Sequence, residues 1–180
     1  MDAQPPRPEN AVDSDLQHRI EQFLYYEASL LDRFAMDEWL SLLSDDLILK
    51  VPIRSDRGPG SERPTFSDET YYLYNDYDML RERVDKLSKE YAWSENPRSR
   101  VRHHLGNVRV SEREDGDYRV WNNQFVYRSQ GDSAEYKLLS AQRESTLREV
   151  ETEAGFELVD RTVYLDHSVL TTKNITLPLL

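Results

Sequence analysis

Hydrophobic and polar positions follow different periods in the two parts of this chain. Before Ser99, apolar residues recur mainly every three or four positions, which is typical of helices. From Ser99 onwards they alternate over long segments separated by turn residues, which is typical of strands. We therefore expect helices first and a sheet second, with Ser99–Val110 as the first long strand of that sheet.

The first expected helix has a clear start and a mostly apolar face. Ser14 and Gln17 have the spacing of a capping box, in which each side chain bonds a free backbone amide at the helix start. Apolar residues then recur at helical spacing over 16–34, and Glu27 is the polar exception on that face. A second, short helix is expected over 37–43, with Asp37 as its N-cap.

The segment between these helices and Ser99 holds weaker signals. Residues 47–53 have the composition of a short strand, in which Pro52 favours an edge or terminal position. Residues 54–67 are expected to form a loop. The tyrosine cluster at 71–77 is expected at the rim of the core or at an interface, because a buried tyrosine ring can keep its hydroxyl in water. A third helix is expected over 78–89.

Four strands are expected in the C-terminal part, joined by hairpin turns rich in Gly and Asp. Long antiparallel strands twist and curl, so that a helix can lie in the concave face. The predicted fold is α+β, with N-terminal helices packed in a strongly curved, mostly antiparallel, cone-shaped sheet. We expect a mobile N-terminal arm over 1–13 and a single domain over 14–180. The expected strands are 100–112, 118–129, 134–150 and 156–170.

Several polar residues share strand faces with apolar ones. A buried polar group without a partner costs about 1–3 kcal/mol, so these residues are expected to line a pocket, pair with each other or meet a second chain. The combinations are Asn123 with Trp121, Phe125 and Tyr127; Arg143 with Leu139 and Ala141; and Arg161 and His167 with Val159, Val163 and Leu165.

Composition limits the chemistry and the partners. The chain has 34 acidic and 23 basic residues, and its formal net charge of −11 disfavours nucleic acid and anionic membranes as partners. It has no cysteine, which removes disulfides, thiolate nucleophiles and thiolate metal ligands. The N-terminus lacks the apolar core of a signal peptide, and no apolar run is long enough to span a bilayer. We expect a soluble, cytoplasmic protein.

The histidines allow one metal-site hypothesis. His103 and His104 are adjacent on a strand and point to opposite faces, so at most one can face a given cavity. One of them could join His167 and either Asp166 or Asp160 at a mononuclear metal. No local spacing supports this site, and hydrogen-bonded strand histidines are the expected alternative.

An acid/base pair inside the cone is the second chemical hypothesis. A curled sheet can enclose a dry pocket in which pKa values shift. The candidate residues are Asp32 and Glu27 on the first helix, Tyr25 or Tyr26, and His103 or His104.

The expected first long strand, Ser99–Val110, also resembles a segment of a known protein family. Ser99–Val110 resembles the signature strand of the small, or beta, subunits of aromatic-ring-hydroxylating dioxygenases, the Rieske non-haem iron oxygenases. Other stretches agree in order, so that the resemblance covers roughly residues 16–175. They are Phe23–Asp32, Trp39–Leu43, Val51–Pro52, Leu80–Leu87, Ala92–Trp93, Asn96–Arg100, Arg143–Arg148 and Asp160–Leu170.

The resemblance implies a fold and an assembly. Beta subunits of this family have a cone-shaped α+β fold similar to scytalone dehydratase and ketosteroid isomerase, and associate with alpha subunits as α3β3. The alpha subunit carries the Rieske [2Fe–2S] cluster and the mononuclear iron. The holoenzyme adds dioxygen across an aromatic ring with electrons from NAD(P)H. This chain would then be a mostly structural subunit of an aromatic-degradation enzyme, with no cofactor or metal of its own, that also self-associates as a trimer.

Two hypotheses follow. In the first, the chain is a non-catalytic subunit, and Arg100, Arg102, Arg143, Arg161 and Asp166 are buried in ion pairs within it or across subunits; we then expect Arg161→Ala or Asp166→Ala to weaken assembly. In the second, it is a stand-alone dehydratase or isomerase of the same fold that uses His103 or His104 with a helix carboxylate such as Asp32. An enzyme needs an open apolar pocket with converging polar groups, whereas a subunit needs a filled cone.

Overall fold

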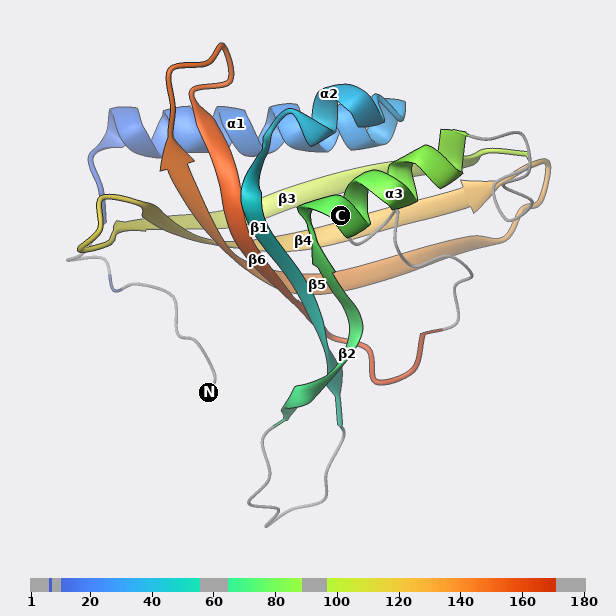
Figure 1. Ribbon diagram of the computed structural model, residues 1–180. Helices are drawn as coiled ribbons and strands as arrows, with labels where there is room; N and C mark the ends of the chain where they lie inside the picture. Colours follow the sequence, from blue (N-terminus) through green and yellow to red (C-terminus); the bar gives the residue numbers. More distant parts are fainter. Residues whose placement is uncertain (1–6, 8–10, 56–64, 89–96, 171–180) are drawn as a thin grey trace.

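The computed structural model describes residue 7 and residues 11–55, 65–88 and 97–170. In these ranges the chain forms three helices and one six-stranded sheet (Figure 1). The arm predicted at 1–13 and the loop predicted at 54–67 lie largely outside the described residues. No helix within the described ranges is long and apolar enough to cross a membrane.

The three helices are α1 (Ser14–Arg33), α2 (Met36–Leu40) and α3 (Tyr77–Ser88). The predicted capping box at the start of α1 is wrong by one residue. Asp13 is the N-cap, and its carboxylate accepts hydrogen bonds of 2.9 Å from the amides of Asp15 and Leu16. Gln17 instead donates to Glu21 and to the Val108 carbonyl. The predicted N-cap of α2 is also wrong, since α2 begins after residue 35 without a side-chain cap.

The sheet has the strand order β2-β1-β6-β5-β4-β3. All neighbouring strands are antiparallel except β1 and β6, which are parallel. The α+β class and the mostly antiparallel sheet are therefore confirmed, and the four predicted C-terminal strands are present. The strands are β1 (Leu43–Arg54), β2 (Phe66–Asp76), β3 (Ser99–Glu112), β4 (Tyr118–Gln130), β5 (Tyr136–Glu149) and β6 (Phe156–Leu165).

The structure lengthens the strand predicted over 47–53 into β1 and adds β2, which was not predicted. β1 is a 12-residue strand inside the sheet, between β2 and β6, so the predicted short length and edge position are wrong, while Pro52 does lie near the end of the strand, which was the other predicted position. Its pairing with β6 ends at Lys50, so Pro52 has only β2 beside it, at a shift in register. A proline is tolerated there because no neighbour on the β6 side needs its missing amide. Most of the tyrosine cluster belongs to β2.

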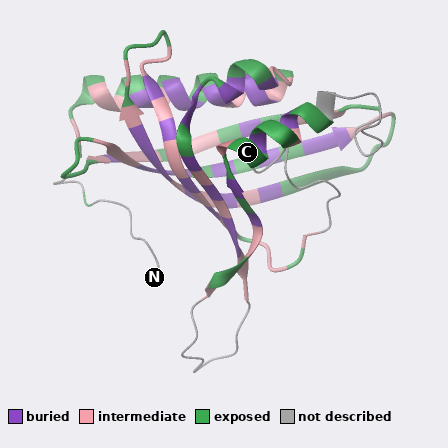
Figure 2. Cartoon of the chain, viewed as in Figure 1, coloured by how far each residue is buried: buried purple, intermediate pink, exposed green. Residues whose placement is uncertain are grey.

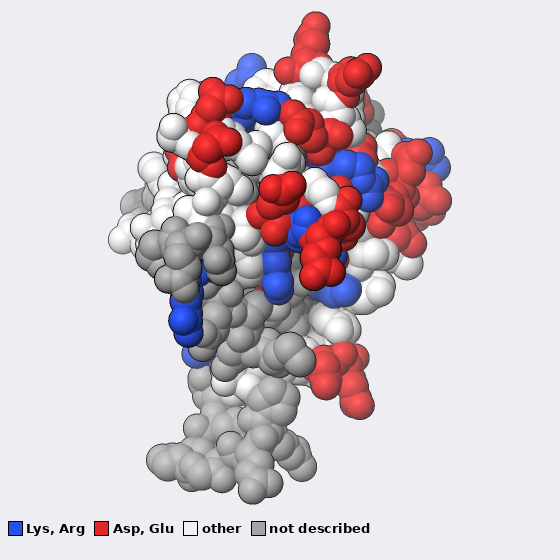
Figure 3. Space-filling model, turned by 90° about the vertical axis from the view of Figure 1, so that its left-hand side faces the viewer, with Lys and Arg blue, Asp and Glu red and all other residues white. Residues whose placement is uncertain are grey.

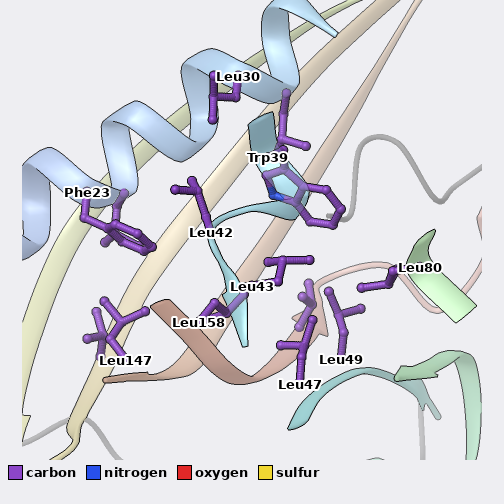
Figure 4. Close-up of a cluster of buried hydrophobic side chains, with 14 of the residues drawn as sticks. Phe23, Leu30, Trp39, Leu42, Leu43, Leu47, Leu49, Leu80, Leu147 and Leu158 are labelled. Atoms are coloured by element: carbon purple, nitrogen blue, oxygen red, sulfur yellow. The ribbon is translucent and has the colours of Figure 1, made fainter. Parts of the chain in front are cut away.

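The sheet curls around α1, which lies along its concave side (Figure 1). The buried residues lie along the inward face of the helices and strands (Figure 2). α1, α2 and α3 contribute Phe23, Leu30, Trp39 and Leu80 to one core, which also holds leucines of β1, β5 and β6 (Figure 4). Burial of this apolar surface is the main force that closes the cone.

The aromatic residues of β4 were expected on an apolar face with Asn123, but the buried face of β4 is the opposite one. The inner face carries Val120, Asn122, Gln124, Val126 and Arg128, which are buried. The predicted face of Trp121, Asn123, Phe125 and Tyr127 is the outer face. Trp121 is covered there by the guanidinium of Arg119, 4.7 Å from its ring centre, whereas Phe125 and Tyr127 are exposed.

Candidate functional site

A group of buried charges occupies the interior between α1 and the sheet. Glu27 on α1 is fully enclosed and faces Arg161 of β6, which is also fully enclosed. Arg161 Nη1 donates to Glu27 Oε1 at 2.7 Å, and Nη2 donates to Oε2 at 2.9 Å. Arg161 Nε donates to Ser145 Oγ at 3.0 Å. This two-pronged geometry is the strongest form of arginine–carboxylate pairing.

Arg143 of β5 is a second buried cation beside the same carboxylate. Its Nη2 lies 3.9 Å from Glu27 Oε2, and its Nε donates to Asn122 Oδ1 at 3.3 Å. Burial and the neighbouring Arg161 lower the pKa of Arg143, while the attraction of Glu27 opposes them. Glu27, Arg161 and Arg143 thus form a buried charge cluster in which two guanidinium groups share one carboxylate. Glu27 is therefore the residue on which the cluster depends.

The cluster sets the ionisation of Glu27. Burial by itself would raise its pKa, but the charges of Arg161 and Arg143 and hydrogen bonds from Arg161 and Trp39 lower it to about 2. Trp39 Nε1 lies 3.4 Å from Glu27 Oε1. Glu27 is therefore charged at neutral pH and is held as a structural anion.

We predict that acid weakens the Glu27–Arg161 ion pair and so lowers the free energy of unfolding. The pKa of Glu27 is lowered from 4.5 to about 2, so the pair stabilises the fold fully above pH 4.5 and progressively less as the pH falls towards 2. The contribution is of the order of 3 kcal/mol. Urea unfolding between pH 6 and pH 3 will measure it. The Glu27→Gln variant has no carboxylate at this position that acid could protonate, so its free energy of unfolding should fall less steeply than that of the wild type between pH 6 and pH 3. An equal fall in both proteins would contradict the assignment of this loss to Glu27.

A second pair links the end of α1 to β3. Asp32 Oδ1 lies 2.7 Å from His103 Nδ1 and accepts the His103 backbone amide at 3.0 Å. Asp32 Oδ2 accepts from Arg102 Nη1 at 3.0 Å. Because a carboxylate only accepts, Nδ1 of His103 carries the proton. His103 Nε2 is buried and has no hydrogen-bond partner in the described part of the chain. One of the hypothesised acid/base pairs is thus brought together.

The other hypothesised chemical residues are not assembled. His104 lies on the outer face and is exposed, and Tyr25 and Tyr26 are exposed on α1. His167 Nε2 accepts from the Ser140 amide at 3.3 Å, and Asp166 accepts from Ser140 Oγ at 2.6 Å. Within residues 7, 11–55, 65–88 and 97–170, no three His, Asp or Glu side chains are close enough to hold a metal ion.

Two pockets formed by described residues lie on the surface, away from the buried charges. One borders the start of α1 and the β5–β6 turn, where Phe23, Tyr26 and Phe156 line it. The other lies on the outer face of β3, β4 and β5, where Arg100, Arg102 and His104 border Phe125 and Tyr127. Arg100 donates to Ser129 Oγ and the Gly131 carbonyl at 3.3 and 2.6 Å, and remains exposed.

Charge is distributed unevenly over the surface. Acidic side chains outnumber basic ones on the end that holds the start of α1 and the β3–β4 and β5–β6 turns (Figure 3). The exposed acids in these two turns and at the ends of the strands that lead into them are Glu112, Glu114, Asp115, Glu149, Glu151 and Glu153. Such a surface repels nucleic acid.

Sequence reasoning identified the members of the buried cluster but not its contacts. Glu27, Arg143 and Arg161 stood out as polar residues on apolar faces, whereas Asn122 and Ser145 were missed. For Asn122 the available signal was its alternation with Val120 and Val126, which placed all three on one face.

Comparison with known proteins decides the family. The family model described as "Ring hydroxylating beta subunit" matches residues 26–172, most of the chain. The chain belongs to the ring hydroxylating beta subunit family. The matched range includes Glu27, Asp32, His103, Arg143 and Arg161, so the two buried pairs lie within the family's own domain.

Named relatives of this ring hydroxylating beta subunit come from several dioxygenases. The benzene 1,2-dioxygenase beta subunit of Pseudomonas putida is 36% identical over 168 residues, which cover 92% of this chain and 89% of the relative. The biphenyl 2,3-dioxygenase beta subunit of Rhodococcus jostii is 37% identical with the same coverage. The 3-phenylpropionate/cinnamic acid dioxygenase beta subunit of Photorhabdus laumondii is 33% identical over 93% of this chain and 94% of its own length.

Solved structures show the same fold. A chain of naphthalene 1,2-dioxygenase superimposes with a TM-score of 0.84 at 23% identity, over 95% of this chain and 89% of that one. A Novosphingobium aromaticivorans protein described as a scytalone dehydratase gives a TM-score of 0.59 at 12% identity, over 85% of both chains. The cone fold is therefore shared by ring hydroxylating beta subunits and by the scytalone dehydratase type, as predicted.

Proposed function

We propose that this beta subunit supports an iron-bearing alpha subunit of an aromatic-ring-hydroxylating dioxygenase, in an α3β3 assembly that degrades aromatic compounds in the cytoplasm. The alpha subunit would hold the Rieske [2Fe–2S] cluster and the mononuclear iron and receive electrons that originate from NAD(P)H. The chain itself has no cysteine to ligate such a cluster. Its contribution would be structural.

The family match over residues 26–172 carries this proposal. The interior gives independent support, because the position where a cone-fold enzyme needs an open pocket holds Glu27 and Arg161, both fully buried and paired to each other. Polar groups engaged in this way are not available to a substrate. They fix how α1 sits in the sheet.

The test is to purify the tagged full-length chain from its native host and to record which proteins accompany it, with the iron content and visible spectrum. We expect a larger chain in equal amount and the absorption of a Rieske cluster. The matched control is the same purification from a strain that expresses the tag alone. A colourless protein without a larger companion would contradict the subunit role.

One observation favours a second candidate, a stand-alone dehydratase or isomerase. Asp32 and His103 form a buried carboxylate–imidazole pair, and His103 Nε2 has no hydrogen-bond partner among the described residues, which is the arrangement of an acid/base pair. In such an enzyme, His103→Gln would abolish turnover of a small cyclic alcohol or ketone while His104→Gln, on the outer face, would not. Equal activity of both variants would exclude a role for this pair.

A further inference from the structure

The interior of the cone holds polar atoms whose hydrogen bonds the two buried pairs do not supply. Gln124 of β4 is 2% exposed, and neither its amide nitrogen nor its amide oxygen has a hydrogen-bond partner in the described part of the chain. Among the same residues, His103 Nε2 on β3 and Arg143 Nη2 on β5 also lack one. Nearly all buried polar groups in folded proteins bond to protein or to ordered water, so these atoms require an occupant.

Strand register places the three side chains along one diagonal of the inner face. The register partners of Gln124 are Leu105 on β3 and Ala141 on β5. His103 and Arg143 each lie two positions from those partners, in opposite directions along the sheet. Diagonal neighbours are about 7–8 Å apart, which long side chains can span. Directly opposite Gln124, β5 carries only the methyl group of Ala141, so it fills little of the space beside the amide.

This diagonal connects the two buried pairs of the interior. His103 Nδ1 lies 2.7 Å from Asp32, and Arg143 Nη2 lies 3.9 Å from Glu27. Both carboxylates belong to α1, which lies along the concave side of the sheet (Figure 1). Gln124 therefore lies between the His103–Asp32 pair and the buried charge cluster, each of which has one hydrogen-bonding atom unused.

The unused atoms determine the chemistry of the occupant. Because Nδ1 of His103 carries the proton, its Nε2 accepts, as does the amide oxygen of Gln124. The amide nitrogen of Gln124 and Nη2 of Arg143 donate. A metal cation cannot accept a hydrogen bond, and a simple anion cannot donate one. Water does both, and a buried water typically makes about three hydrogen bonds to groups of this kind.

We propose that ordered water binds on both sides of the Gln124 amide and joins the His103–Asp32 pair to the buried charge cluster. Gln124 is then the residue that positions the internal water. One hydrogen-bonded network, in place of two separate pairs, ties α1 to the sheet from β3 to β6. Water-mediated bonds are nearly as favourable in enthalpy as direct ones, so this network stabilises the fold. The inference does not depend on the proposed function.

The direct test is a crystal structure of the full-length protein, in whatever complex it forms, at a resolution that shows ordered water. We expect water about 2.7–3.2 Å from the Gln124 amide atoms, from His103 Nε2 and from Arg143 Nη2. A Gln124 amide bonded only to protein groups, an amide with no water beside it, or a larger molecule in this space would overturn the inference.

Gln124→Met tests the same site through the sign of its effect on stability. Methionine keeps the unbranched shape of glutamine but cannot hold the water in place. The variant then leaves His103 Nε2 and Arg143 Nη2 unpaired, and its melting temperature should fall by about 5 °C. If the amide held no water, its removal would delete an unpaired polar group and the melting temperature would rise. An unchanged or higher melting temperature would therefore overturn the inference.

Gln22→Met is the matched control, because Gln22 is an exposed glutamine on α1. Its melting temperature should stay within about 1 °C of the wild type. Circular dichroism of both variants checks that the fold is intact. A control that melts as low as Gln124→Met would show that the loss does not come from the interior, and would contradict the inference.

His103→Asn separates the water bond from the ion pair. The asparagine amide can still donate to Asp32, as Nδ1 of His103 does, but it has no atom in the place of Nε2. Both His103→Asn and Gln124→Met remove the same water, so the loss of melting temperature in the double variant should be smaller than the sum of the single losses. Additive losses would show that His103 and Gln124 share no water, and would overturn the inference.

Discussion

Replacing Glu27 with glutamine is expected to lower the free energy of unfolding by close to 5 kcal/mol, about the upper end of the range for a broken buried ion pair. The reason is that Glu27 is the carboxylate between two buried guanidinium groups, Arg161 and Arg143. The amide keeps the shape of the side chain but leaves both cations without a counter-charge. Urea unfolding at pH 7 is the measurement.

Glu38→Gln is the control for this prediction. Glu38 is an exposed glutamate on α2, so its loss should change the free energy of unfolding by less than about 0.5 kcal/mol. A Glu27→Gln variant that unfolds at the same urea concentration as the control would mean that the cluster contributes nothing to stability.

Replacing Arg161 with methionine is expected to cost about 3 kcal/mol at pH 7, less than the loss of Glu27. In this variant one anion and one cation remain, because Arg143 still lies beside Glu27. The arginine that most lowers the pKa of Glu27 is then gone, while burial still raises it. Glu27 therefore binds a proton more readily in the folded variant than in the folded wild type, and the stability that the variant loses relative to wild type should be smaller at pH 3 than at pH 7.

Arg148→Met is the matched control for Arg161→Met. Arg148 also pairs with carboxylates, those of Glu157, Asp117 and Asp46, but its side chain is 40% exposed. Water screens such pairs, so the expected loss is about 1 kcal/mol or less. If Arg161→Met lost the same free energy of unfolding relative to wild type at pH 3 as at pH 7, the ionisation of Glu27 would not depend on Arg161.

These expectations separate two roles for polar residues in this beta subunit. Arg161 is fully buried, so its loss would weaken assembly only through the fold. Asp166 is exposed and bonded to Ser140, so its loss would act at the surface. The sequence-based prediction that both variants weaken assembly therefore covers two mechanisms, which melting temperature and oligomer mass will distinguish.

The sequence by itself determined the class of fold and the family. Helical spacing in 16–34 and strand alternation after Ser99 predicted a helix in a curled sheet, and the turns at 114–117 and 130–132 predicted its hairpins. The order of motifs indicated a dioxygenase beta subunit, and the family match confirmed it. These features are local, because spacing and turn residues report on the backbone of their own segment.

Only the tertiary structure decided which residues meet. Alternation along β4 shows that Trp121 and Asn122 face opposite ways, but not which of them faces the helix. In β6, an irregularity around Val159 shifts the pairing between Leu158 and Asp160, so that Leu158 and Arg161 both face inward.

The two buried pairs depend on distant parts of the chain. Glu27 and Arg161 are 134 positions apart, and Asp32 and His103 are 71 positions apart. Burial forces each charge to find a partner, but the partner is chosen by how α1 packs on the sheet. That packing is a property of the whole fold, which no single segment of the sequence contains.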